Sequence, residues 1–148
     1  MMSLEEINKM WAKDCKIDEI DLEAASRETA RLHQKYLELF MVAKMQLKRR
    51  DQEKAILLKD RWLYFTGKMS QAEMTAKGWP FDPFDGLKIL RTDLDYYFQA
   101  DPLLQKADEK ITYAKVLAEA LEDILGMIRW RHQHIKTIME YRRFTSGN

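Results

Sequence analysis

The sequence predicts an all-α protein, a long helical hairpin with short accessory helices. Only 5 glycines and 3 prolines occur, and they cluster, so long stretches contain no residue that breaks a helix. In two of these stretches the apolar residues recur three and four positions apart, as along one face of a helix. With 148 residues and 46% apolar side chains, the chain suits a single domain, residues 1–148. Within it we expect N-terminal helices at 1–68, a connector with short helices at 69–101 and a long C-terminal helix at 102–148.

The first part of the chain is expected to form a short helix and then a very long one. Ser3 and Glu6 have the spacing of a capping box, which predicts a short helix that ends at about Cys15. The apolar pattern resumes at Leu22, and no glycine or proline intervenes before Gly67. One helix of about forty residues is the simplest prediction. Gly67 suits its carboxyl end, because glycine readily adopts the left-handed backbone that closes a helix.

The middle of the chain is less regular. Ser70 and Glu73 form a second capping-box spacing, which predicts a short helix that Gly78 would stop. The segment 79–86, WPFDPFDG, is expected to be a loop, since its prolines lack amide donors and favour extended residues before them. Its three aromatic residues should pack against another part of the protein. Residues 87–100 are a further helix candidate.

A second long helix is expected to begin at Pro102, because proline suits the first helical position. Its apolar seam advances by three or four residues at every step and consists of Leu104, Ala107, Ile111, Ala114, Ala118, Leu121, Leu125, Ile128, His132, Ile135, Met139 and Arg142. One hairpin would leave much of this stripe uncovered, so we expect self-association. The residues assigned to it are Ile111, Ala114, Ala118, Leu121, Leu125, Ile128, Ile135 and Met139. A closed monomeric bundle is the alternative.

Several classes of protein are disfavoured by the composition. The single cysteine, Cys15, excludes an intramolecular disulfide framework, and an acidic start without an apolar core argues against a secretory signal, so a reducing cytoplasm is expected. The longest apolar runs are about five residues, far short of the ~20 that span a bilayer, so no membrane association is expected. His132 and His134 diverge on a helix, which disfavours a metal site. No phosphate-binding glycine loop or nucleophile motif occurs, so neither enzymatic activity nor a cofactor is expected.

The charges are strongly segregated, although the net charge is only +1. Residues 44–68 carry 8 basic and 3 acidic side chains, and residues 129–148 carry 5 and 1, while the remaining segments are acidic. This distribution favours an anionic partner at two places. For the second region, favourable interaction with the carboxyl end of a helix dipole is an equally good explanation.

In the first basic segment, aromatic residues are interleaved with the cations. Cations that follow phosphates, combined with aromatic rings that stack on unpaired bases, are typical of proteins that bind single strands. The residues assigned to this contact are Lys48, Arg50, Lys54, Lys59, Arg61, Tyr64 and Lys68. The alternative is an amphipathic helix with a solvated basic face and its aromatic residues in the core.

Residues 58–68, LKDRWLYFTGK, resemble the Leu-Lys-x-Arg-x-x-Tyr-aromatic-small-Gly-basic motif of the UvsY recombination mediator family of T-even-like bacteriophages. The resemblance extends loosely over the whole chain, through its length, its acidic start and its basic carboxyl end. Trp62 and Leu63, within the motif, and the loop at 79–84 depart from the family pattern.

The resemblance implies a non-enzymatic protein in the cytoplasm of the infected bacterial host. Such a protein binds single-stranded DNA and helps a RecA-like phage recombinase to displace the phage single-strand-binding protein, in recombination, repair and recombination-dependent replication. The resemblance also implies a hexameric or heptameric ring assembled through the C-terminal helix, and DNA contacts at Lys59 and Arg61.

Helix geometry complicates the implied pair of contacts. On a straight helix Lys59 and Arg61 point about 200° apart, so one face cannot present both to the same stretch of strand. A distorted helix end, a role for one residue at a protomer interface, or strands that run between protomers would each reconcile the two. Two other functions remain open: a helical coiled-coil interaction protein without direct DNA binding, and a general nucleic-acid-coating protein.

Overall fold

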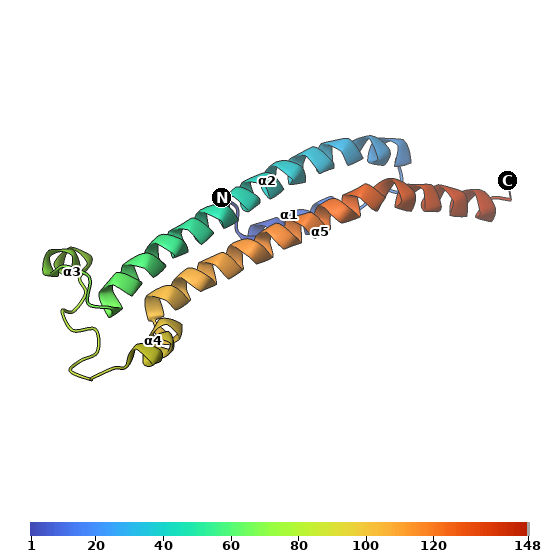
Figure 1. Cartoon of the computed structure of the whole chain (residues 1–148). Helices are drawn as coiled ribbons and strands as arrows, with labels where there is room; N and C mark the ends of the chain where they lie inside the picture. The colour runs from blue at the N-terminus through green and yellow to red at the C-terminus, as the bar shows by residue number, and fades with distance from the viewer. Residues whose placement is uncertain (148) are drawn as a thin grey trace. The chain divides into compact units, whose positions relative to one another are not determined.

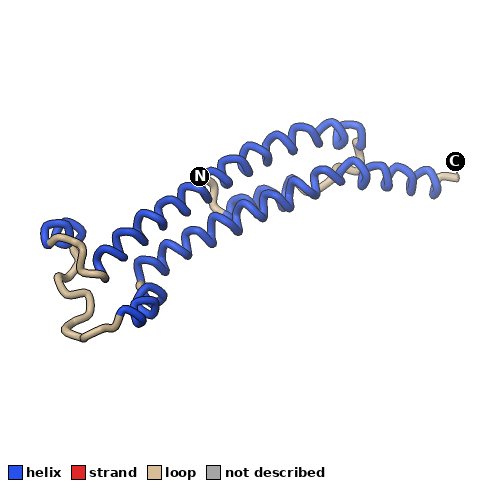
Figure 2. The backbone as a smooth tube through the Cα atoms, viewed as in Figure 1, coloured by secondary structure: helices blue, strands red, loops and turns tan. Residues whose placement is uncertain are grey.

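The computed structural model describes residues 1–147, and in this range the chain forms helices, turns and loops without any strand (Figure 1, Figure 2). The elements are α1 (Leu4–Asp14), α2 (Leu22–Phe65), α3 (Gln71–Lys77), the 3-10 turn η1 (Arg91–Asp93), α4 (Leu94–Ala100) and α5 (Pro102–Thr145). The two long helices, α2 and α5, have 44 residues each. The predicted all-α class is confirmed.

Most helix ends lie where the local sequence signals predict them. At the start of α1 the Glu6 amide donates to the Ser3 hydroxyl over 3.1 Å, and the Ser3 amide donates to the Glu6 carboxylate over 2.7 Å. Gly67 follows α2 with a φ of 72°, and the next amide, of Lys68, donates to the Leu63 carbonyl over 2.9 Å. These bonds satisfy backbone groups that have no partner within the helix.

The helix expected over residues 87–100 is only partly correct. Leu90 is extended, with a ψ of 152°, and η1 and α4 follow it. The Leu90 amide donates to the Asp93 carboxylate over 3.3 Å, and the Asp93 amide donates to the Leu90 carbonyl over 2.9 Å. These two hydrogen bonds satisfy the amides of Leu90 and Asp93 and start the helical segment just after Leu90. An apolar pattern alone does not reveal this start.

The chain divides into two compact units. The first unit comprises Met1–Gln46 and Ala114–Asn148, and the second comprises Leu47–Tyr113. The boundaries fall inside α2 and α5, because each long helix contributes one part to each unit. They therefore do not coincide with the expected segments 1–68, 69–101 and 102–148, and a single domain stays a prediction.

The core of the first unit is made by three helices. Ile7 of α1, Leu32 and Tyr36 of α2, and Leu121 and Leu125 of α5 belong to one buried cluster. In Figure 1, α1 lies alongside the two long helices. In this unit α2 and α5 run antiparallel, and α1 supplies the third side of the bundle.

This packing removes the reason to expect self-association through the apolar seam of α5. The chain itself buries six of the eight residues assigned to oligomerisation, namely Ala114, Ala118, Leu121, Leu125, Ile128 and Ile135. Ile111 is half-buried and Met139 is exposed. Since α1 and α2 cover most of this stripe within the chain, the assignment of these residues to oligomerisation stays a prediction.

The predicted seam also loses its register near the end of α5. His132 is exposed, and the neighbouring Arg131 is buried instead. The Arg131 guanidinium donates to the Ala25 carbonyl over 3.1 Å and to the Thr29 hydroxyl over 3.2 Å. Apolar residues spaced three and four positions apart therefore locate the buried face with an error of about one residue. The error arises where a long polar side chain such as Arg131 finds hydrogen-bond partners in the interior.

A polar network closes the side of the first unit where α1 meets α2. The Asp14 carboxylate accepts from the Lys35 ammonium over 2.6 Å and from the Tyr36 hydroxyl over 2.9 Å. The Trp11 ring meets the Tyr36 ring edge-on at 5.4 Å between centroids. Burial acts to raise the pKa of Asp14, but the hydrogen bonds from Lys35 and Tyr36 outweigh it, so this pKa lies below its ordinary value.

We expect the contribution of Asp14 to stability to disappear in acid. A carboxyl whose pKa is lowered by folding stabilises the fold fully above its unfolded pKa, near 3.8, and this contribution is lost as the pH falls through the folded pKa. The difference in unfolding free energy between the wild type and D14N should therefore be largest near neutral pH and shrink below pH 3.8. Urea unfolding across this range measures it. The exposed Asp51, replaced in D51N, is the control, and a difference independent of pH would contradict the assignment.

Candidate nucleic-acid interface

The second unit is organised around an aromatic cluster. Its buried members, from the end of α2 to α3, are Tyr64, Phe65, Met69 and Met74, and the residues packed against them include Trp79, Phe84, Tyr97 and Phe98. Of the three aromatic residues in the loop after α3, two therefore pack as expected, whereas Phe81 is exposed. The cluster attaches the connector and α4 to the end of α2.

Arg61 lies inside this unit. Its guanidinium donates to the two carboxylate oxygens of Asp101, over 2.5 Å from Nε and 3.2 Å from Nη2. The rings of Tyr64, Phe65 and Trp79 lie 4.6 to 4.8 Å from the guanidinium carbon. Arg61 is 8% exposed, so its guanidinium forms an ion pair with a carboxylate and cation–π contacts with aromatic rings instead of facing solvent.

Asp101 connects this ion pair to the start of α5. The same carboxylate accepts from the Leu103 amide over 3.1 Å, and the Asp101 carbonyl accepts from the Gln105 amide over 2.9 Å. One buried carboxylate thus neutralises Arg61 and caps α5, and it joins the end of α2 to the beginning of α5 within the second unit.

Arg61 and Tyr64 were both assigned to DNA binding and both are buried, so their contact with a strand stays a prediction. Tyr64 is buried, and its hydroxyl donates to the Pro80 carbonyl over 2.6 Å. Burial raises the pKa of this tyrosine. Lys59 points to solvent with 67% of its side chain exposed, as the angular argument requires for a residue about 200° from Arg61.

The other residues assigned to DNA binding lie at or near the surface. Lys48 and Lys68 are exposed. Arg50 is half-buried and lies 2.9 Å from the Glu53 carboxylate, and Lys54 lies 2.5 Å from the Asp108 carboxylate. The ammonium of Lys59 is 3.8 Å from the carboxylate of its neighbour Asp60. The charges of Lys48, Lys59 and Lys68 are thus the most accessible of the set.

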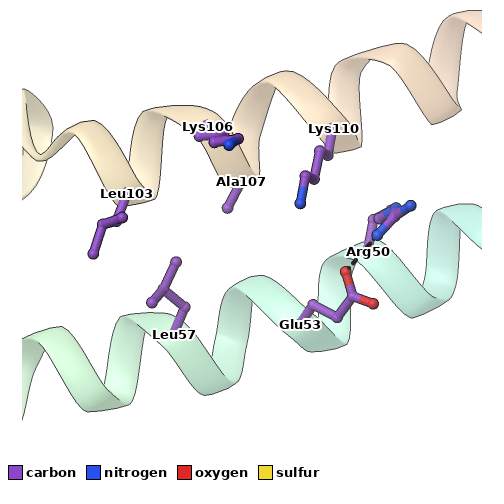
Figure 3. Close-up of a pocket in the computed structure, with 7 residues that line it drawn as sticks. All are labelled: Arg50, Glu53, Leu57, Leu103, Lys106, Ala107 and Lys110. Atoms are coloured by element: carbon purple, nitrogen blue, oxygen red, sulfur yellow. Dashed lines mark hydrogen bonds and ion pairs between the residues drawn. The ribbon is translucent and has the colours of Figure 1, made fainter. Parts of the chain in front are cut away.

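A basic pocket lies where α2 faces α5 in the second unit (Figure 3). Its volume is about 220 Å³, and it is lined by Arg50, Glu53, Leu57, Leu103, Lys106, Ala107 and Lys110. In Figure 3 the side chains of Leu57 and Leu103 face each other from the two helices. The lining combines three cations with one carboxylate, which favours an anionic group at its mouth.

Sequence reasoning missed three surface residues of this unit. Lys106 and Lys110 were not recognised because they lie in a segment, 69–128, whose overall charge is acidic. Their spacing of four residues on a helix that begins at Pro102 was the available signal. Trp62 was not assigned to DNA binding either, although it is one turn from Lys59 on the same helix face.

The second basic region is partly used inside the first unit. Arg131 is buried, and the Arg142 guanidinium donates to the Glu19 carbonyl. Lys136 lies 3.9 Å from the Glu140 carboxylate on the same helix. Intrachain partners thus account for much of this charge, so the second unit offers the better candidate interface.

Two other kinds of site find no support in the described part of the chain. Among residues 1–147, no group of three or more histidine, cysteine, aspartate and glutamate side chains is arranged to hold a metal ion. Within the same range, no helix has the length and apolar character needed to cross a membrane.

Comparison with known proteins identifies the family. The chain matches the family model described as recombination, repair and ssDNA binding protein UvsY over residues 10–148. The chain belongs to the UvsY family. The resemblance drawn from residues 58–68 is thereby confirmed.

UvsY of bacteriophage T4 matches over almost its whole length, in sequence and in structure. Recombination protein uvsY of Enterobacteria phage T4 is 25% identical over 146 residues, which is 99% of each chain. A crystal structure of the bacteriophage T4 recombination mediator protein UvsY superposes with a TM-score of 0.80 at 25% identity, covering 99% of both chains. A second crystal form gives 0.78 at 24% identity, covering 97% of this chain and 99% of the other. The UvsY fold is therefore retained at low sequence identity.

Proposed function

We propose that this chain is a recombination mediator that binds single-stranded DNA and promotes the loading of a RecA-like phage recombinase onto strands covered by single-strand-binding protein. Membership of the UvsY family supports it, since the family description names recombination, repair and ssDNA binding. The observation that carries the binding step is that the second unit exposes Lys48 and Lys59 on α2 and Lys68 just after this helix. The protein acts without catalysis, in the cytoplasm of the infected host.

The contacts to the strand divide into two groups. Lys48, Lys59 and Lys68 are exposed and supply cations to the phosphates, and the basic pocket adds Lys106 and Lys110 from α5. Arg50 also lines this pocket, and Arg50 and Lys54 each keep a carboxylate partner. Arg61 and Tyr64 do not touch the strand, and they hold the end of α2 in place from inside.

A homo-oligomeric ring, hexameric or heptameric, is part of the proposal. The first unit exposes large apolar side chains on helix faces that the intrachain core does not use, namely Met41, Val42, Met45, Val116, Met127, Trp130, Tyr141 and Phe144. Apolar surface of this extent favours contact with another protein surface. In a ring, one strand engages several protomers, and weak contacts gain affinity by effective concentration.

Replacing the exposed lysines should change the salt dependence of DNA binding. K48A and K59A each remove one cation that faces a phosphate, so each is expected to reduce the slope of log affinity against log salt by ~0.7 on single strands. Fluorescence anisotropy with a labelled oligonucleotide measures the slope. K9A, which removes an exposed lysine of the first unit, is the matched control and should leave the slope unchanged. Wild-type slopes and affinities in K48A and K59A would contradict the proposed contacts.

The same variants test the recombinase step. Strand exchange by a RecA-like phage recombinase on DNA covered with single-strand-binding protein should accelerate when the wild type is added, and less so with the K48A/K59A double variant. A protein that only coats nucleic acid would bind the strand without this acceleration. A helical interaction protein would bind no strand in the anisotropy experiment.

A further inference from the structure

We propose that Trp62 is the platform on which this protein stacks an unpaired base, with Lys59 and Lys68 on either side for the adjoining phosphates. The proposal rests on the proposed DNA-binding function and names one aromatic contact within it. The ligand is a nucleobase of a single strand, whose flat face is free only when the base is unpaired.

The end of α2 separates its aromatic residues into two groups. Tyr64 and Phe65 are in the aromatic core, whereas Trp62 is 42% exposed. Trp62 follows Lys59 by three residues, which places the two side chains as neighbours on one face of the helix. The solvent-facing ring of this segment is therefore the indole rather than the tyrosine that the motif contains.

Lys68 supplies a second cation beside the same ring. Its ammonium lies 4.3 Å from the centroid of Trp62, just beyond the glycine that ends α2. Phe81 and Tyr96 are also exposed in this unit, but within residues 1–147 neither ring has a cation placed over it. Trp62 thus combines an exposed ring with the Lys68 ammonium over it and with Lys59 one helical turn away, and sequence-tolerant strand binding uses such a combination of aromatic rings and cations.

The contact with Lys68 does not block a base. An exposed ammonium over an indole is held weakly, whereas stacking of a base on an aromatic ring is the stronger interaction. The lysine stem is flexible, so its ammonium can leave the ring for the phosphate of the stacked nucleotide. In the free protein one ammonium lies over the partly exposed indole, and the bound strand replaces this cation contact by a stacking contact and an ion pair.

The test compares two strands of equal length, an oligothymidylate and an abasic strand with the same phosphates. W62A should bind the oligothymidylate about 5- to 100-fold more weakly than the wild type, and W62F should retain part of the affinity. On the abasic strand W62A and the wild type should bind alike. K59A should weaken binding to both strands, since it removes a cation that faces a phosphate. The strand should also quench indole fluorescence in the wild type and less in W62F.

The outcomes separate this inference from the function on which it rests. Wild-type binding by W62A, together with weakened binding by K59A, would overturn the stacking role and leave the DNA-binding function standing. If W62A weakens binding to both strands equally, or changes the oligomer size in sedimentation, Trp62 acts in the fold or at a protomer contact. Either result would also overturn the stacking role. If neither W62A nor K59A changes binding, both proposals fail.

Discussion

Replacing Arg61 by alanine is expected to lower the free energy of unfolding by about 3–5 kcal/mol, because it leaves the Asp101 carboxylate buried without its partner. The Arg61 side chain is 10% exposed and that of Asp101 is 0% exposed, so solvent cannot replace the missing bonds. The guanidinium also fills the space between Tyr64, Phe65 and Trp79, and its removal loosens the aromatic core. Urea unfolding monitored by circular dichroism measures the effect.

The matched control is K59A, which removes an exposed cation two residues away on the same helix. This variant should change the unfolding free energy by no more than ~0.5 kcal/mol while it weakens DNA binding. R61A should weaken DNA binding only to the extent that it unfolds the second unit, so added osmolyte should restore affinity in R61A and not in K59A. An R61A protein of wild-type stability that binds DNA poorly would show that Arg61 touches the strand.

D101N completes a double-mutant cycle with R61A. The amide oxygen of asparagine can still accept from the Leu103 amide, so the cap of α5 is largely kept while the charge is removed. The destabilisation of R61A/D101N should then be smaller than the sum of the two single effects, since either change alone removes the same ion pair. Additive effects would show that the two residues act independently.

Local signals predicted the helices well because their causes are local. Ser3 with Glu6, the glycine after α2 and Pro102 act within a few residues of the ends they define, and each lies where it was expected. The angular divergence of Lys59 and Arg61 was also correct, since it depends only on the helical repeat. Sequence alone therefore indicated that one helix face cannot present both cations to the same stretch of strand.

The sequence did not reveal which of the two cations is buried. The choice depends on Asp101, which is forty positions away in the chain and faces Arg61 only after folding. The covering of the α5 seam depends in the same way on α1, a short helix whose packing partner no local pattern identifies. Both points concern burial, which is decided by contacts distant in sequence.

Leu121, which was assigned to oligomerisation from the sequence, should behave as a core residue of the protomer. It is 0% exposed in the cluster that α1, α2 and α5 form, so L121A removes buried methyl groups and leaves a cavity. We expect the free energy of unfolding to fall by about 2–5 kcal/mol. Denaturant unfolding at several protein concentrations separates this effect from dissociation, since destabilisation of the protomer persists when the concentration is raised.

Val116 provides the comparison on the same helix and in the same unit, because its side chain is exposed while that of Leu121 is enclosed. V116A should leave the unfolding of the isolated protomer almost unchanged, and it should reduce the assembled fraction in sedimentation if this face forms the ring. If instead L121A dissociates the assembly without lowering the stability of the protomer, the apolar seam of α5 forms the interface between protomers. Because the seam is enclosed by α1 and α2, we expect the two variants to separate stability from assembly.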